Sequence, residues 1–271
     1  MLRNGLVLAL MIVLSVLAGA RSQAAVVLVD PTNLNGWAFN TTDNNGAVGL
    51  GSGTGDFVTG PATPPIGTGS AHLQTPSGGG DQSVQLRNTS WAGTSLSALT
   101  ALSYSTYAAS WNGQQLPYLT LYLDTDGNPG YDDRLHFEPT YSNGPNPGTE
   151  AQNVWQTWDA FNGKWYADSQ GSQSVNDVFS LTNYASFGTA VIVNAAPGLG
   201  GIRLTSGFAS DTDNFNTNVD NFTIGTAAGT TTYNFEPTTA AVPETSSIVV
   251  WSVLVSMIGG AYWCRRQMAT R

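Results

Sequence analysis

The chain has 271 residues, of which 9 are Lys or Arg and 18 are Asp or Glu, so its formal net charge is −9. Five of the nine Lys and Arg residues lie near the two ends. Without these five, four basic residues remain against 18 acidic ones, which gives a net charge of 4 minus 18, or −14, and argues against a nucleic acid partner. The single cysteine, Cys264, excludes an internal disulfide, and two histidines are too few for a usual structural zinc site.

Residues 1–24 have the pattern of a secretory signal peptide. Arg3 precedes an apolar run over Leu6–Ala18, and Ser22-Gln23-Ala24 places small residues where signal peptidase requires them. The apolar run is too short for a membrane anchor, which needs about 20 residues. We therefore expect signal peptidase to cleave before Ala25 and the rest of the chain to be exported.

The body, residues 25–240, is rich in Gly, Ser, Thr, Asn and aromatic residues and poor in Lys, Glu and Leu. This composition disfavours helices and predicts an all-β fold, a single antiparallel β-sandwich of jelly-roll type. Asn162-Gly163 and Asn112-Gly113 predict hairpin turns. The Gly/Pro-rich segment 44–80 is either a surface loop or several short edge strands. Strands are predicted over Ala25–Val29, Ser83–Arg87, Leu102–Trp111, Leu116–Leu123, Leu135–Glu138, Val154–Phe161, Lys164–Ala167, Ala190–Asn194, Gly201–Leu204, Asn218–Gly225 and Thr230–Phe235.

Aromatic residues concentrate in the middle of the body, and an exposed set of rings is what a carbohydrate binder uses, although large aromatics are more often core. The candidate platform consists of Trp111, Trp155, Trp158 and Trp165. Catalysis has weaker support, because there is no Gly-x-Ser-x-Gly elbow. Carboxylates for a glycoside hydrolase are available, but their spacing selects no pair; they are Glu138, Glu150, Asp159 and Asp168.

The acidic stretch 124–133 is the strongest candidate for a metal site in the body. Alternating carboxylate and amide side chains on a turn place oxygen ligands around one point, which suits calcium. The first positions resemble an EF-hand loop, but Pro129 replaces the turn glycine and Leu135 stands where a closing Glu would be. The alternative is an acidic turn whose side chains cap backbone groups. The predicted ligands are Asp124, Asp126, Asn128, Asp132 and Asp133.

A second metal candidate lies near the end of the body. Val219–Ile224 resembles the closing strand of jelly-roll carbohydrate-binding modules, in which an Asp beside the first strand holds a structural calcium. The resemblance implies that Asp220 is a calcium ligand, with Asp30 as a conceivable partner. The alternative is an ordinary final strand with alternating faces.

The tail, residues 241–271, carries three consecutive signals. Val242-Pro243-Glu244-Thr245 precedes an apolar segment predicted to form a transmembrane helix over 246–263, and Arg265-Arg266 follows it. This order resembles the PEP-CTERM sorting tail, which an exosortase recognises, although Thr245 stands where the motif usually has its second proline. Val242, Pro243, Glu244, Arg265 and Arg266 would be the sorting residues. The resemblance implies an inner-membrane anchor with the body outside, then release to the cell surface or extracellular matrix.

Together these features predict an exported, exosortase-sorted surface protein without catalysis, whose surroundings include extracellular polysaccharide. A calcium-dependent carbohydrate-binding module is the first alternative. A glycoside hydrolase, with two carboxylates facing each other across a groove, is the second.

Overall fold

The computed structural model describes residues 24–42, 49, 52–76, 83–113, 115–142, 149–170, 178–195, 199–207 and 214–237. The first 23 residues of the predicted signal peptide, the sorting residues and the predicted helix 246–263 lie outside this set. Within it, no helix has the length and apolarity to cross a membrane. All the described residues belong to one compact unit, residues 1–238.

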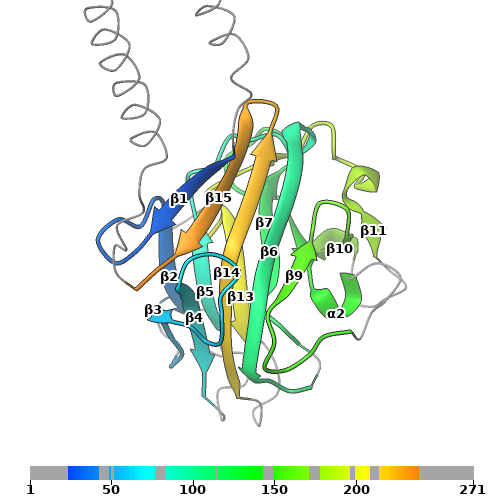
Figure 1. Cartoon of the computed structure of the whole chain (residues 1–271). Coiled ribbons are helices and arrows are strands. Elements are labelled where there is room, and N and C mark those ends of the chain that lie inside the picture. Colours follow the sequence, from blue (N-terminus) through cyan, green and yellow to red (C-terminus); the bar gives the residue numbers. More distant parts are fainter. Residues whose placement is uncertain are drawn as a thin grey trace, which may run out of the picture. The chain divides into compact units, whose positions relative to one another are not determined.

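Two β-sheets build this unit (Figure 1), which confirms the all-β, two-sheet prediction. The short helical turns are η1 (Leu96–Ala98), α2 (Pro139–Ser142), η2 (Asp168–Gln170) and η3 (Leu181–Asn183). The seven-stranded sheet contains, in spatial order, β1 (Ala25–Val29), β15 (Gly229–Phe235), β14 (Phe215–Thr226), β4 (Gly69–Thr75) and β3 (Thr54–Thr59), with β6 (Leu99–Ser110) pairing β14 and β9 (Gln156–Asp159) pairing β6. The eight-stranded sheet contains β11 (Phe179–Ser180), β10 (Lys164–Ala167), β8 (Asp133–Phe137), β7 (Tyr118–Asp124), β13 (Ile202–Gly207), β5 (Ser83–Asn88) and β2 (Trp37–Thr42), with β12 (Val191–Ile192) pairing β7.

One strand pair departs from the predicted antiparallel arrangement. β1 runs parallel to β15, with Val29 beside Phe235, whereas the other paired strands are antiparallel. These are the first and last described strands, so no tight hairpin joins them and nothing forces opposite directions.

The core lies between the sheets and follows from alternation along the strands. In β7, Leu119, Leu121 and Leu123 are buried in the core cluster, while the intervening side chains point to the outer face of the eight-stranded sheet. Trp37 of the same sheet packs edge-on against three rings of the opposite sheet, with centroid distances of 5.2 to 5.4 Å. This packing fixes which side of each strand faces outward.

The two predicted hairpins are wrong. Asn162-Gly163 joins β9 in one sheet to β10 in the other, so these strands do not pair. Gly163 does not have a positive φ; instead, a Cβ there would lie 2.2 Å from Cε2 of Phe137. Asn112-Gly113 likewise joins β6 to β7 across the sheets, although Gly113 does have a φ of 83°. Both segments carry the chain from one sheet to the other, and glycine is needed at Gly113 for its positive φ and at Gly163 for the close approach of Phe137.

Candidate functional site

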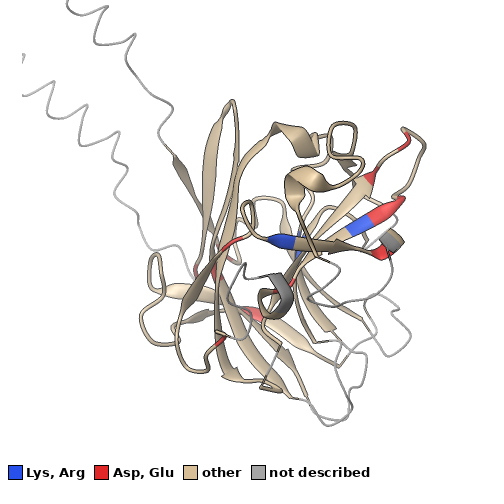
Figure 2. Cartoon of the chain, turned by 90° about the vertical axis from the view of Figure 1, so that its right-hand side faces the viewer, with Lys and Arg blue, Asp and Glu red and all other residues tan. Residues whose placement is uncertain are grey.

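The outer face of the eight-stranded sheet is polar and aromatic across five strands. Its strand register aligns one row of side chains perpendicular to the strands. The row consists of Arg87, Arg203, Thr120, His136 and Tyr166. The described Lys and Arg residues, blue in Figure 2, all lie within strands of this sheet.

Two cavities open on this face. The larger has a volume of about 290 Å³ and is lined by Gln115, Tyr118, Arg134, His136, Glu138, Tyr166 and Asp168. The smaller, of about 110 Å³, shares Tyr118, Arg134 and His136 with it. The two cavities share these three residues and therefore adjoin each other over β7, β8 and β13, and we call them together the outer-face site.

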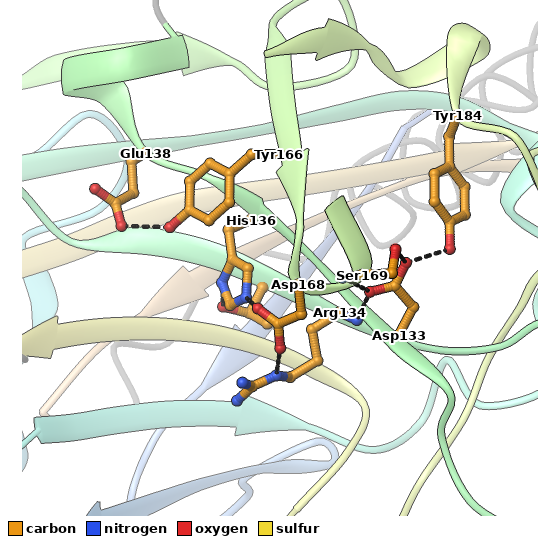
Figure 3. Close-up of polar contacts among 9 residues, drawn as sticks. Asp133, Arg134, His136, Glu138, Tyr166, Asp168, Ser169 and Tyr184 are labelled. Atoms are coloured by element: carbon orange, nitrogen blue, oxygen red, sulfur yellow. Dashed lines mark hydrogen bonds and ion pairs between the residues drawn. The ribbon is translucent and has the colours of Figure 1, made fainter. Parts of the chain in front are cut away.

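Asp168 connects two of the wall residues (Figure 3). Its Oδ1 lies 3.0 Å from Nε2 of His136, and its Oδ2 accepts a hydrogen bond from Nε of Arg134. Burial alone would raise the pKa of Asp168, but the hydrogen bond and charge of His136, together with Arg134, hold it below its ordinary value. Asp168 is therefore an ionised carboxylate that orients an imidazole and a guanidinium at the mouth of the site.

Glu138 lines the same cavity in a different environment. Tyr166 donates a hydrogen bond of 2.6 Å from its hydroxyl to Oε1 of Glu138, and the Tyr166 ring stacks on His136 at 5.0 Å (Figure 3). Burial raises the pKa of Glu138, against the opposing effects of the Tyr166 hydrogen bond and the His136 charge. The wall thus combines two carboxylates, an imidazole, a guanidinium and two tyrosine rings within one hollow.

The acidic loop between β7 and β8 partly matches the predicted calcium site. Ligand atoms of Asp124, Asp126 and Asp132 lie within 4.8 Å of one another. Asn128 stays beside them, because its Nδ2 donates to Asp126 at 2.7 Å. The same carboxylates also accept backbone hydrogen bonds, as when Asp124 Oδ1 accepts from Gly127 at 2.6 Å. The arrangement suits a cation and also suits the alternative acidic turn, so calcium remains a prediction.

Asp133 does not belong to this cluster. It is buried on the opposite face of β8, where Ser169 and Tyr184 donate hydrogen bonds of 2.6 and 2.7 Å to its Oδ2 (Figure 3). The reason is the alternation of the strand, which turns Asp133 and Leu135 inward and turns Arg134 outward. Its predicted role as a metal ligand is therefore corrected to a structural one.

Asp220 lies in β14 of the seven-stranded sheet, whereas the acidic loop joins two strands of the eight-stranded sheet. It is buried and accepts hydrogen bonds of 3.3 Å from the backbone N–H groups of Ile66 and Phe235. Burial raises its pKa to about 7, although these backbone bonds favour the ionised form. Asp30 is also buried, and its Oδ1 accepts from Thr32 and Asn33. Backbone N–H groups thus hold both carboxylates, while Oδ2 of Asp30 is buried without a hydrogen bond, and calcium at Asp220 and Asp30 stays a prediction.

The predicted tryptophan platform is wrong as a set. Trp158 and Trp165 are buried, and their indole N–H groups donate to Thr106 and to the carbonyl of Ala160. Trp111 and Trp155 are partly buried; Trp111 packs against the core cluster, and Trp155 packs against Tyr107 and donates to the carbonyl of Pro61. These rings were needed to fill the space between sheets and under a loop, which is the usual use of large aromatics.

Sequence reasoning missed the outer-face site, except that Glu138 and Asp168 were among the carboxylates considered. The available signal was alternation. Both Tyr118-Leu119-Thr120-Leu121-Tyr122 and Arg134-Leu135-His136-Phe137-Glu138 set polar or aromatic side chains opposite a strictly apolar face.

Comparisons with known proteins add little to this geometry. No family model matches the chain, and no curated protein matches it. Among solved structures, the family 11 carbohydrate-binding module of cellulosomal cellulase Lic26A-Cel5E of Clostridium thermocellum is similar, with a TM-score of 0.41 and 9% identity. The superposition covers 73% of this chain and 92% of that one. Similarity at this level carries no information about function.

Proposed function

We propose that this protein is an exported, non-catalytic carbohydrate-binding protein whose glycan lies in the outer-face site. The observation that supports this most is the composition of the 290 Å³ hollow, where the partly buried Tyr118 ring stands beside the polar groups of Arg134, His136 and Asp168. A sugar presents an apolar CH face and a ring of hydroxyls, and therefore needs both kinds of surface at once. Rigid strands hold these groups, which suits binding without large rearrangement.

Calcium has a defined place in this proposal. The acidic loop joins β7 to β8, the two strands that carry Tyr118, Arg134 and His136. A cation held by Asp124, Asp126 and Asp132 would stabilise the turn and, through it, the two strands of the site.

Export and sorting complete the proposal and rest on the sequence of the two ends. Signal peptidase would release the chain at Ala25, and the tail with Arg265-Arg266 would hold it in the inner membrane until an exosortase processes it. The body would then stand at the cell surface or in the extracellular matrix, where polysaccharide is the natural partner.

A glycoside hydrolase is the second candidate, because two carboxylates line one cavity. The pKa of Glu138 is raised by burial, whereas the pKa of Asp168 is lowered by His136 and Arg134, a division typical of an acid and a nucleophile or base. We favour binding because Glu138 is almost fully buried and already accepts from Tyr166. Release of reducing sugar by the wild-type chain, abolished in Glu138→Gln, would instead establish hydrolysis.

The test of binding compares two aromatic truncations in the full-length chain, purified in a mild detergent. Gels containing neutral and acidic polysaccharides should retard the wild-type chain, and Tyr118→Ala should lose that retardation. Trp155→Ala is the matched control, because Trp155 is a partly buried ring on the other sheet's side of the fold. Loss of binding in Trp155→Ala with retention in Tyr118→Ala would place the ligand elsewhere and refute the proposal.

A further inference from the structure

Three of the four cations in residues 25–240 gather on the outer face of the eight-stranded sheet. They are Arg87, Arg134 and Arg203. Arg203 lies directly opposite Arg87 in the β13–β5 register, and Arg134 lies opposite Tyr122 in the β7–β8 register. The Tyr122 ring receives two of the guanidinium groups, with Arg203 at 4.7 Å and Arg134 at 5.8 Å from its centroid. A strongly acidic body has thus concentrated its positive charge on one surface.

Asp168 favours the charge of Arg134, but for Arg87 and Arg203 this concentration is electrostatically unfavourable in the protein alone. Burial lowers the pKa of Arg203, and the charges of Arg87 and Arg134 lower it further, against the opposite effect of Tyr122. Burial also lowers the pKa of Arg87. Like charges held close together in a partly desolvated place repel one another, and an anion bound among them would offset that repulsion.

The two carboxylates that line the outer-face site do not provide a counter-charge in both of its cavities. Asp168 is engaged with Arg134 and His136, and Glu138 accepts from Tyr166. The smaller cavity has Arg134, Arg203 and His136 in its wall, and none of its described lining residues is Asp or Glu. An anionic ligand in this cavity would therefore meet three basic side chains and no described carboxylate.

Two further polar groups at this face lack partners among the described residues. Oε1 of Gln85, in the wall of the smaller cavity, and Nε of Arg87 are both buried without a hydrogen bond. Gln85 itself is only 2% exposed, so leaving its carbonyl oxygen unsatisfied is unfavourable. Of the two, only Gln85 lines a cavity, and its carbonyl oxygen requires a donor, which a sugar hydroxyl would supply.

We infer that the outer-face site binds a glycan carrying carboxylate groups, a uronic acid polymer, with Arg134 and Arg203 holding the carboxylate and Gln85 accepting from a neighbouring hydroxyl. This inference rests on the proposed carbohydrate-binding function and adds the class of glycan. The body as a whole repels a polyanion, but at about 0.1 M salt that repulsion is screened beyond roughly 10 Å, whereas contacts inside the site are not. A sulfated glycan offers the same oxyanion chemistry, so the test must separate the two sources.

The decisive comparison uses the wild-type chain, full-length in detergent, and needs no variant. Calorimetry at 0.15 M salt would measure binding to polygalacturonate, to its fully methyl-esterified form, to dextran sulfate and to a neutral β-glucan. We expect polygalacturonate to bind at least about tenfold more tightly than the methyl ester, because esterification removes the charge and keeps the sugar. Preference for dextran sulfate over polygalacturonate would overturn the carboxylate assignment.

Variants then locate the contact. Arg203→Gln should weaken polygalacturonate binding at least about tenfold, and Arg203→Lys should restore part of it, since the charge returns without the planar fork. Lys164→Gln is the matched control, because Lys164 lines neither cavity and the charge change is the same. Equal weakening by Lys164→Gln would show a general charge effect and overturn the inference.

Failure of the inference and failure of the proposed function have different signatures. Binding to the neutral glucan or the methyl ester as tight as binding to polygalacturonate would leave carbohydrate binding standing and refute the acidic class. Absence of binding to all four polymers would contradict both.

Discussion

Replacing Asp220 with Asn should remove a pH dependence from the stability of the fold. Burial raises the pKa of Asp220 from the ordinary 3.8 to about 7. Between these values the folded state binds the proton and the unfolded state does not, so this group's contribution to stability falls as pH rises from about 4 to 7. At about 1.36 kcal/mol for each tenfold change in proton affinity, the loss above pH 7 is on the order of 4 kcal/mol.

The variant keeps the shape of the protonated carboxyl but cannot ionise. Its amide oxygen can accept from Phe235, whereas its NH₂ group cannot accept from Ile66, a loss of about 1 kcal/mol. We therefore expect Asp220→Asn to be about 3 kcal/mol more stable than wild type at pH 8 and slightly less stable at pH 4. Chemical unfolding at both pH values measures this directly.

A control and a refuting outcome follow from the same geometry. Asp159 is exposed, so Asp159→Asn should change stability by a similar small amount at both pH values. Parallel pH profiles for wild type and Asp220→Asn, whatever their offset, would show that the pKa of Asp220 is the same in the folded and unfolded states and would refute the reasoning.

Three further predictions concern the sheet crossing, the acidic loop and the tail. Gly163→Ala should destabilise the fold by about 1–3 kcal/mol in chemical unfolding, because the new Cβ meets an aromatic ring of β8. Millimolar calcium should raise the melting temperature, and the double change Asp124→Ala, Asp126→Ala should abolish that increase. Replacing Arg265 and Arg266 with Glu should block tail processing in a host that carries the cognate exosortase.

Each of these predictions has its own control. Gly188→Ala should leave stability nearly unchanged, because a Cβ there has nothing within 4 Å; equal destabilisation would refute the packing argument at Gly163. A calcium response that survives the double change would move the site away from the acidic loop. Normal processing of the Glu variant would contradict the sorting assignment.

Composition and alternation were sufficient to predict an all-β, two-sheet body, because both depend only on local properties of the chain. Strands such as β1, β7 and β15 were located within a few residues for the same reason. β2, β3 and β4 were not resolved as strands, since β2 carries a mixed sequence and the other two lie in the Gly/Pro-rich segment 44–80. Of that segment, β4 forms an interior strand rather than an edge strand, because β14 pairs with its other side.

The candidate site was harder to predict because it depends on which strands become neighbours. His136 meets Tyr166 only after β10 pairs with β8, and Arg203 meets Arg87 only after β13 pairs with β5. Residues far apart in sequence then share one face, and no local pattern encodes that pairing. Asn162-Gly163 shows the opposite problem. Its sequence predicts a hairpin, but the segment connects two strands that lie in different sheets.

The central claim is that ligand binds the outer face of the eight-stranded sheet. Hydrogen–deuterium exchange of the full-length chain, with and without saturating polygalacturonate, tests it strand by strand. We predict slower exchange in peptides that cover β7, β8 and β13, with no change in β3, β4 and β9 of the other sheet. Protection confined to β9 and the segment around Trp155, with β7 and β8 unchanged, would contradict the account.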